Sequence, residues 1–275
     1  MSFEKLREVP VGQVRSAVRR GDYAHHTAGL APGCLQANLV VLPKAQSAEF
    51  EQFCTLNPRP CPIVGQTLAG DPHFRTLGDD VDVRRDLPSY NIYRNGELVE
   101  QVSDLGAHWN DDLIAFALGC SFTFENALTR AGISLWHIAN NTTVPMFRTN
   151  LPLAEVGPFK GHMVVSMRAL AAKDVDQATE ISARYPWAHG GPVHVGDPAA
   201  IGIADITKPD WGDPAPVERG QVPMFWACGV TPQAVVIDAK LPFVITHTPG
   251  HMLITDVPED SDVRAAAAAQ SSQFI

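Results

Sequence analysis

VPMFWACGVTPQAVVIDAKLPFVITHTPGHMLITD, residues 222–256, is a strand-helix-strand pattern from which the rest of the fold can be worked out. The apolar run 222–227 is long enough for a buried strand and too short for a helix. Thr231 followed by Pro232 is an N-cap with proline at the first helical position, and Pro242 ends the helix. The run 243–246 is a second strand, so the stretch predicts a β-α-β crossover with parallel strands.

Reactive side chains follow both predicted strands. Cys228 and His247 would leave parallel strands at one sheet edge, where ligands bind in open α/β sheets. The alternative is that Cys228 is a small buried hydrophobe and that His247 hydrogen-bonds a turn. Pro249-Gly250 prevents a continuing helix and places His251 with His247 in a tight loop, which makes the two histidines stronger catalytic candidates than Cys228.

The amino-acid composition excludes several classes of function. The 275 residues are 45% hydrophobic and 19% charged, which is typical of one large or two smaller globular domains. A net charge of -9 without a Lys/Arg stripe argues against a nucleic-acid partner. The first residues lack the apolar core of a signal peptide, and no run has the length of a membrane span, so we expect a cytoplasmic protein without a membrane partner. The five cysteines have no CxxC spacing and should be free thiols.

The N-terminal half repeats the mixed pattern. Residues 3–20 predict one helix, or two short helices separated by Pro10. A glycine-rich loop then leads into the apolar run 39–42, a predicted strand, and a helix and a second strand at 62–64 follow. Asn95-Gly96 predicts a hairpin over 91–102, because both residues accept the positive φ angles of a type I′ turn. A parallel or mixed sheet with flanking helices is therefore expected.

The segment HWNDDLIAFALGCSFTFENALTRAGI, residues 108–133, predicts two helices that meet at Gly119-Cys120, with Ser121 capping the second. The helix N-terminus at Cys120 would favour an anion, either a thiolate or a substrate carboxylate. Ser121 and Glu125 would share a helix face. The alternative is an ordinary helical hairpin with a capping serine and a solvated glutamate.

Two arginines are candidates for binding a carboxylate. Arg148 and Arg168 lie at or near the ends of predicted strands at 144–149 and 162–167, and a guanidinium fork suits bidentate binding. The alternative for each is a structural ion pair. Asn150 follows Arg148 within the same segment.

A glycine-rich loop contains His189, His194 and Asp197, which are possible metal ligands. Their spacing matches no closed metal motif, and Asp197-Pro198 also fits a helix N-cap and first position. The identity of any metal stays open at this point.

Eight segments together resemble a known family. They are GLAPGCLQANLVVLP, GCSFTFENAL, NNTTVPMFRTN, VVSMRAL, HGGPVHVGDP, KPDWGD, VPMFWACGVTPQ and ITHTPGHMLITD. In order, over about residues 27–256, they resemble the bacterial hydro-lyase family related to D-glutamate cyclase. His25-His26 and Cys34 depart from the residues expected in the first of these regions.

The resemblance implies an α/β core formed by residues 1–115 and 206–275, with a smaller α+β domain inserted at 116–205. It also implies a carbon-oxygen lyase, since the cyclase relatives convert D-glutamate to 5-oxo-D-proline and water. The expected substrate is a small acidic amino-acid-like carboxylate, and a homo-oligomer is compatible with the sequence.

This resemblance frames the hypothesis for the site. Carboxylates would be held by the helix N-terminus at Cys120-Ser121 and by further polar side chains, namely Arg148, Arg168, Asn150 and His194. One of His247, His251 and Glu125 would act as base and another as acid. An acyl-enzyme route through Cys120 or Cys228, or a divalent Mn²⁺ or Mg²⁺ ion, is an alternative. The competing hypothesis is a non-catalytic binding protein for a small carboxylate metabolite.

Overall fold

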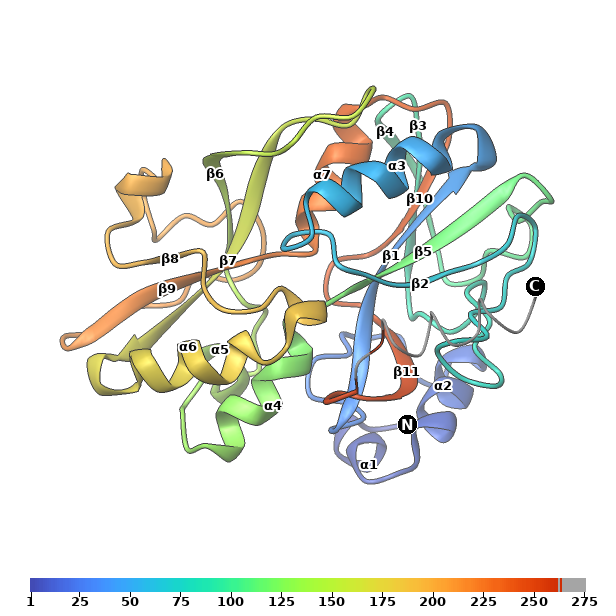
Figure 1. Cartoon of the computed structure of the whole chain (residues 1–275). Coiled ribbons are helices and arrows are strands. Elements are labelled where there is room, and N and C mark those ends of the chain that lie inside the picture. Colours follow the sequence, from blue (N-terminus) through green and yellow to red (C-terminus); the bar gives the residue numbers. More distant parts are fainter. Residues whose placement is uncertain (262, 264–275) are drawn as a thin grey trace.

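The computed structural model describes residues 1–261 and 263, and it contains two separate β-sheets (Figure 1). The larger sheet, at the right of the figure, has the strand order β2-β5-β1-β10-β3-β4, with β11 also paired to β1. The smaller sheet, at the left, has the order β6-β7-β9-β8. The strands of the larger sheet are β1 (Cys34–Pro43), β2 (Ile63–Gln66), β3 (Tyr90–Arg94), β4 (Glu97–Val102), β5 (Leu113–Gly119), β10 (Val244–His247) and β11 (Leu253–Pro258). Those of the smaller sheet are β6 (Met146–Pro152), β7 (His162–Ala171), β8 (His194–Val195) and β9 (Gln221–Ala227).

Helices cover both sheets and fill the junction between them. The helices are α1 (Phe3–Arg7), α2 (Val11–Arg19), α3 (Lys44–Leu56), α4 (Phe122–Arg130), α5 (Trp136–Ala139), α6 (Val175–Ala183) and α7 (Val230–Asp238). Helix α7 contacts β7 of the smaller sheet and β10 of the larger one, while α4 contacts α6 and β1. Both helices therefore bridge the two sheets. No helix within the described residues is long and apolar enough to cross a membrane.

The predicted parallel or mixed sheet is wrong, although the mixture of helices and strands is confirmed. Every strand pair in the described residues is antiparallel. Strands β9 and β10 do flank a helix, but β9 joins the smaller sheet, and β10 lies between β1 and β3 of the larger sheet. The apolar runs identify two buried strands, but they contain no information on which sheet each strand joins.

The segment before Cys120 is a strand, not the predicted helix. Strand β5 pairs along its length with β1, from Leu113 opposite Pro43 to Gly119 opposite Ala37, and all seven of its residues are buried. A run that is apolar on both faces cannot be assigned to helix or strand by periodicity. Gly119 is not a helix C-cap either, because a Cβ there would lie 1.5 Å from the carbonyl oxygen of Trp187.

Several local predictions are confirmed. Residues 3–20 form two short helices, with α1 before Pro10 and α2 after it. Asn95 and Gly96 have φ angles of 51° and 83° and connect β3 to β4 as the hairpin turn. The helical part predicted for the tail after residue 263 lies outside the described residues. The predicted domain limits stay a prediction, although the strands of the smaller sheet all lie within residues 146–227.

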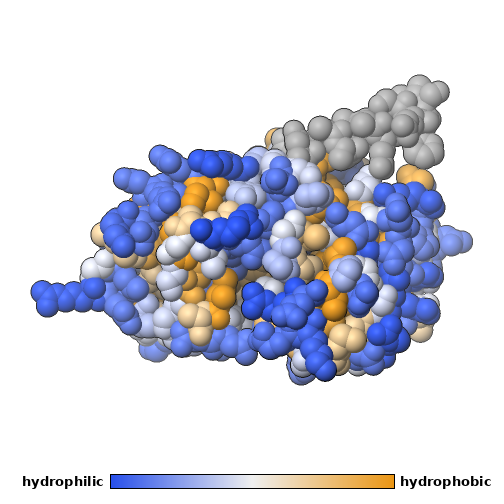
Figure 2. All heavy atoms as spheres, turned by 90° about the horizontal axis from the view of Figure 1, so that it is seen from below, coloured by the Kyte–Doolittle hydropathy of each residue, from blue (hydrophilic) through white to orange (hydrophobic). Residues whose placement is uncertain are grey.

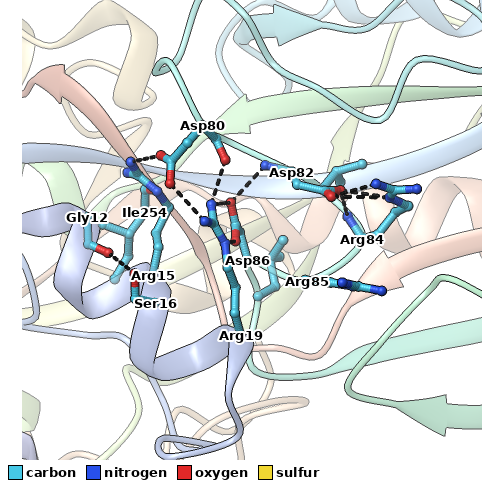
Figure 3. A network of polar contacts seen from close by, with 12 residues as sticks. Gly12, Arg15, Ser16, Arg19, Asp80, Asp82, Arg84, Arg85, Asp86 and Ile254 are labelled. Atoms are coloured by element: carbon cyan, nitrogen blue, oxygen red, sulfur yellow. Dashed lines mark hydrogen bonds and ion pairs between the residues drawn. The ribbon is translucent and has the colours of Figure 1, made fainter.

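An ion-pair network holds α2 against the larger sheet (Figure 3). The Arg15 guanidinium donates to Asp80 at 2.6 Å and to both oxygens of Asp256, at 2.7 and 2.9 Å. One turn further, Arg19 donates to Asp80 at 2.8 Å and to Asp86 at 2.8 Å. We call these five residues the α2 network. Since Asp256 lies on β11, the network joins the N-terminal helices to the end of the described chain.

The face on which α1 and α4 lie is mostly hydrophilic. Figure 2 views the molecule from below and shows apolar residues in separate groups, with hydrophilic residues between them. No continuous apolar surface is visible on this face, as expected of residues that contact water.

Candidate functional site

A small cavity of about 30 Å³ lies where the two sheets meet. We call it the inner cavity. Its wall combines Asn38 of β1, the segment between β5 and α4, the segment between β9 and α7, and His247 at the end of β10. Residues 143–146 and the loop 249–252 complete the wall. A cavity of this volume has room for a few water molecules or for one end of a small ligand.

Two cysteines occupy equivalent positions on opposite sides of the sheet junction. Cys120 directly follows β5, and α4 begins two residues later; Cys228 directly follows β9, and α7 begins two residues later. Backbone N–H groups of Phe122 and Val230 approach the two sulfurs. The inner cavity is therefore bordered by two helix N-termini, each with backbone donors and a partial positive charge that suit an oxyanion.

Both cysteines are protonated at neutral pH. Burial raises the pKa of the Cys228 thiol to about 11, although the Val230 N–H lowers it. Burial raises the pKa of Cys120 further still, against the opposing effect of the Phe122 N–H. The arrangement therefore presents two neutral thiols, which are proton donors, in place of a resting thiolate nucleophile.

Asn38 is a residue that the sequence analysis missed. Its side-chain amide nitrogen donates to the carbonyl oxygen of Gly119 at 2.7 Å and is buried against the start of α7. A Cβ on Gly229 would lie 2.0 Å from this nitrogen, so only glycine fits between Cys228 and the helix. No sequence signal singles out Asn38, since Gln36 is a second polar residue in the same apolar strand.

His247 is a fully enclosed imidazole, 1% exposed. The backbone N–H of Leu39 donates to its Nδ1 at 3.0 Å, and the carbonyl oxygen of Leu39 lies 3.4 Å from the same nitrogen. The side-chain amide of Gln233, on α7, lies 2.9 Å from the ring nitrogens. Burial lowers the pKa of His247 to about 4, so the ring is neutral at physiological pH.

Glu125 and Arg168 lie together behind the inner cavity and do not line it. The guanidinium of Arg168 donates to Glu125 and, through Nη2, to the Oγ of Ser121 at 3.0 Å. The Nε2 of His137 lies 3.0 Å from the same Glu125 oxygen. We call Ser121, Glu125, His137 and Arg168 the inner network. Ser121 occupies the N-cap position of α4, but its hydroxyl makes no cap bond and accepts from Arg168 instead.

The inner network keeps Glu125 ionised. Burial alone would raise the pKa of this carboxyl, but the charges of His137 and Arg168 outweigh burial and lower the pKa to about 2. Arg168 also lies over the rings of Phe124 and Trp226, at 5.3 Å from each centroid. Its guanidinium is thus fully engaged by neighbouring groups, and it can act on a ligand through Ser121.

The other predicted site residues lie elsewhere. Arg148 and Asn150 are exposed on β6, and the guanidinium of Arg148 stacks at 4.9 Å from the Trp211 ring centroid. His194 directs its Nε2 to the carbonyl oxygen of Asp197 at 2.7 Å. His251 lies next to the inner cavity, between two residues that line it, Gly250 and Met252.

The metal ligands considered for the glycine-rich loop do not converge. His189 is buried and bonds the carbonyl oxygen of Arg59 at 2.7 Å, while Asp197 accepts from the N–H of Ala199 at 3.0 Å. Throughout the described part of the chain, no group of three or more His, Cys, Asp and Glu side chains is placed to hold a metal ion. No step below is therefore routed through a metal.

A second, larger cavity of about 780 Å³ lies beside the first, and we call it the outer cavity. It is lined by α1, the loop at residues 23–29 and the segment at 137–142, including His137. Asn141 and Thr142 line the outer cavity, whereas Thr143 and Val144 line the inner one, so this segment separates the two. His137 was missed because a lone histidine twelve residues after Glu125 has no recognisable spacing.

Comparison with known proteins agrees with the resemblance seen in the sequence. The family model described as D-glutamate cyclase matches residues 114–256. A protein of Dinoroseobacter shibae named "Putative hydro-lyase" is 54% identical over 95% of this chain and 87% of its own length. Proteins with the same description from Jannaschia sp. and Ruegeria pomeroyi are 57% and 54% identical, covering 90% and 99% of this chain and 94% and 99% of their own lengths.

Among solved structures, a nitrogen repressor-like protein from Methanococcus jannaschii aligns over 89% of this chain and 94% of its own length. The TM-score is 0.40 and the sequence identity 9%. A likeness of this size carries no argument about fold or function.

Proposed function

This chain belongs to the D-glutamate cyclase family, and we propose that it is a hydro-lyase acting on a small acidic amino-acid-like substrate. The observation that supports this most strongly is the inner cavity, where two helix N-termini, two thiols and a neutral imidazole meet. The specific reaction proposed is the conversion of D-glutamate to 5-oxo-D-proline and water.

The proposed chemistry needs an oxyanion site and two proton transfers. The α-amino nitrogen attacks the side-chain carboxyl carbon, a C–N bond forms, a C–O bond breaks, and the oxygen leaves as water. Negative charge develops on the carboxyl oxygens during the attack, and the N-termini of α4 and α7 supply backbone donors for it. In total, the substrate ammonium must lose two protons to become the lactam N–H, and the leaving carboxylate oxygen must gain two protons to depart as water.

The groups at the inner cavity suit these roles. Cys120 and Cys228 are neutral thiols and can donate a proton to the leaving oxygen. His247 is neutral and can transfer a proton, with His251 in the adjoining loop. Because the inner cavity holds only about 30 Å³, it would receive the reacting carboxyl group while the rest of the substrate lies outside it.

Turnover of a defined panel of acids tests the proposal. Purified protein is incubated with D-glutamate, L-glutamate, D-aspartate and hydroxy-dicarboxylates, with and without Mn²⁺ or Mg²⁺, and substrate and product are followed by chiral chromatography. D-Glutamate should be depleted with equimolar 5-oxo-D-proline formed. Substitutions Cys228→Ser and His247→Gln should each lower kcat/KM by at least about 10-fold, which corresponds to one lost transition-state contact.

Cys34→Ser is the matched control, because Cys34 lies outside both cavities and should retain full activity. If no acid in the panel is consumed under any condition, yet some raise the melting temperature, the protein is a carboxylate-binding protein and the enzyme proposal fails.

A further inference from the structure

We propose that the outer cavity is a binding chamber for a small carboxylate, and that His137, held by Glu125, presents its Nδ1 to this chamber as a proton acceptor. The proton-acceptor part rests on the proposed function, whereas the binding part does not. Neither the outer cavity nor His137 was among the sites expected from the sequence.

The size and charge of the outer cavity favour a small anion. Its volume of about 780 Å³ lies within the range of roughly 300 to 1,000 Å³ that is usual for small-molecule sites. Its described lining includes Arg7 and the imidazoles of His25, His26 and His137, against one carboxylate, Glu4. Arg7 is a fixed positive charge in this lining, and the ring N–H groups of the histidines can donate to an anion.

The lining groups are available for a ligand. Within the described residues Arg7 makes no ion pair, and its guanidinium lies 5.8 Å from the Phe3 ring centroid. His26 also lines the chamber, and its ring reaches that space through atoms other than Nδ1, which is fully enclosed and has no hydrogen-bond partner in this part of the chain. The His26 ring packs at a tilt against Phe3, and the His25 ring packs edge-on against Tyr23, each with ring centroids 5.6 Å apart.

His137 has the geometry of an oriented base. Its side chain is 4% exposed, and its Nε2 lies 3.0 Å from a carboxylate oxygen of Glu125. Because Glu125 is ionised, it accepts a hydrogen bond from the Nε2–H group. Whenever the ring holds a single proton, that proton lies on Nε2 toward Glu125 and the lone pair lies on Nδ1. Among the described residues no group hydrogen-bonds the Nδ1 of His137. This atom is also not among the polar atoms that are both unpaired and cut off from solvent, so we infer that it faces the outer cavity, which His137 lines. A carboxylate that fixes one imidazole nitrogen and leaves the other free is the arrangement of a general base.

The inner network links the two cavities. His137 lines the outer cavity, Ser121 lines the inner one, and Glu125 and Arg168 join them through bonds of about 3 Å. A second contact point is the approach of His26 to Gly250, where an added Cβ would lie 3.7 Å from the Cβ of His26. A substrate in the outer cavity would thus have its amino group near His137, while its carboxyl group extends toward the inner cavity.

Binding of glutarate, a five-carbon dicarboxylate without an amino group, tests the chamber directly. Isothermal titration should detect glutarate with the unmodified protein, and Arg7→Gln and His26→Gln should each weaken the affinity by about 10-fold or more. Arg20→Gln removes an arginine at the C-cap of α2 that lines neither cavity, so this variant should retain the affinity within about 3-fold. Absence of glutarate binding, or equal weakening by Arg20→Gln, would overturn the chamber.

The role of His137 is tested by spectroscopy and kinetics together. Nitrogen-15 NMR of the imidazoles should find His137 protonated at Nε2 and unprotonated at Nδ1, and Glu125→Gln should alter this tautomer. His137→Gln should lower kcat by about 100-fold or more while the glutarate affinity changes by less than about 3-fold. A proton on Nδ1 alone, or full kcat in His137→Gln, refutes the proton acceptor. If glutarate binds as expected but no acid is turned over, the proposed function fails and the chamber stands.

Discussion

The α2 network and the inner network use the same chemistry in different surroundings. Both join arginines to carboxylates on segments far apart in the sequence. In the α2 network water reaches two of the three acids, since the side chains of Asp80 and Asp256 are 51% and 36% exposed, while Asp86 is enclosed. In the inner network Arg168, Glu125 and His137 are at most 4% exposed. In the α2 network water can replace a side chain that is removed, whereas in the inner network no water can reach the buried groups to do so. The two networks should therefore respond differently to substitution and to acid.

Removing the negative charge of the inner network should have the largest effect. Glu125→Gln leaves Arg168 buried without its counter-charge, and we expect a loss of about 3 to 5 kcal/mol in the free energy of unfolding. Asp80→Asn in the α2 network should cost about 1 kcal/mol or less, because the carboxylate is half exposed and Arg15 retains Asp256. Urea unfolding of both variants checks this, and equal losses would show that enclosure is not the deciding factor.

Acid should act with opposite sign on Glu125 of the inner network and on Asp86 of the α2 network. The pKa of Glu125 is lowered from 4.5 to about 2 in the fold, so its contribution is full above pH 4.5 and is lost as the pH falls toward 2. Burial raises the pKa of Asp86 above 3.8 despite Arg19, so its ionised form opposes folding and acid relieves that cost. Glu125→Gln should therefore flatten the acid-induced loss of stability, by an amount on the order of 2 to 3 kcal/mol, and Asp86→Asn should not.

Urea midpoints at pH 5, 4 and 3 measure these slopes for the unmodified chain and the two variants. A curve for Glu125→Gln that runs parallel to that of the unmodified chain would contradict the depressed pKa.

Two cysteines, one beside each network, allow the difference in solvent access to be measured. Cys34 lies near Asp256 and Arg15 of the α2 network, and Cys120 lies near Glu125 and Arg168 of the inner network. Burial raises the pKa of both thiols, but Cys34 is partly exposed, so iodoacetamide should modify it at least about 10-fold faster at pH 8. Mass spectrometry of the modified peptides follows both sites, and unfolding in urea should remove the difference. Equal rates in the folded protein would mean that the inner cavity opens readily.

The smallest effect is expected for an arginine outside both networks. Arg148→Ala removes a stacking contact with Trp211 and a 3.9 Å ion pair with Asp238 whose side chains are 55% and 61% exposed. The free energy of unfolding should change by about 0.5 kcal/mol or less. Arg168→Met removes the buried arginine and should lower the free energy of unfolding several times more than Arg148→Ala. Similar losses in urea unfolding would contradict the contrast between the buried and the exposed arginine. Binding of a substrate carboxylate by Arg148, Asn150 or His194 stays a prediction.

Local sequence patterns predicted individual turns and helix breaks better than they predicted which strands pair with each other. The Asn95-Gly96 turn and the break at Pro10 were predictable because one or two residues determine the backbone there. The orientation of the sheets was not, because strand pairing is decided between segments that the sequence does not link. Strand β5 shows the limit most clearly, since its seven buried residues fit a strand or a buried helix equally well.

The site was predictable in part for the same reason. Cys120, Ser121, Cys228 and His247 were expected from their places at element ends, and the structure brings all four to the inner cavity. His137 and Asn38 could not be selected, because their roles arise from contacts with Glu125 and Gly119 across the chain. Arg148 and Arg168 looked alike in the sequence and differ only in burial.

The central place of β10 determines when the larger sheet can be completed during synthesis. Strands β6, β7, β8 and β9 can all pair once residue 227 has emerged. Strand β10 instead separates β1 from β3, so until residues 244–247 are made, the larger sheet exists as two parts with unpaired edges. Long sequence separation between paired strands slows folding. The nascent chain should therefore depend on residues 244–247 to protect those edges, and truncation before residue 244 should yield an aggregating product.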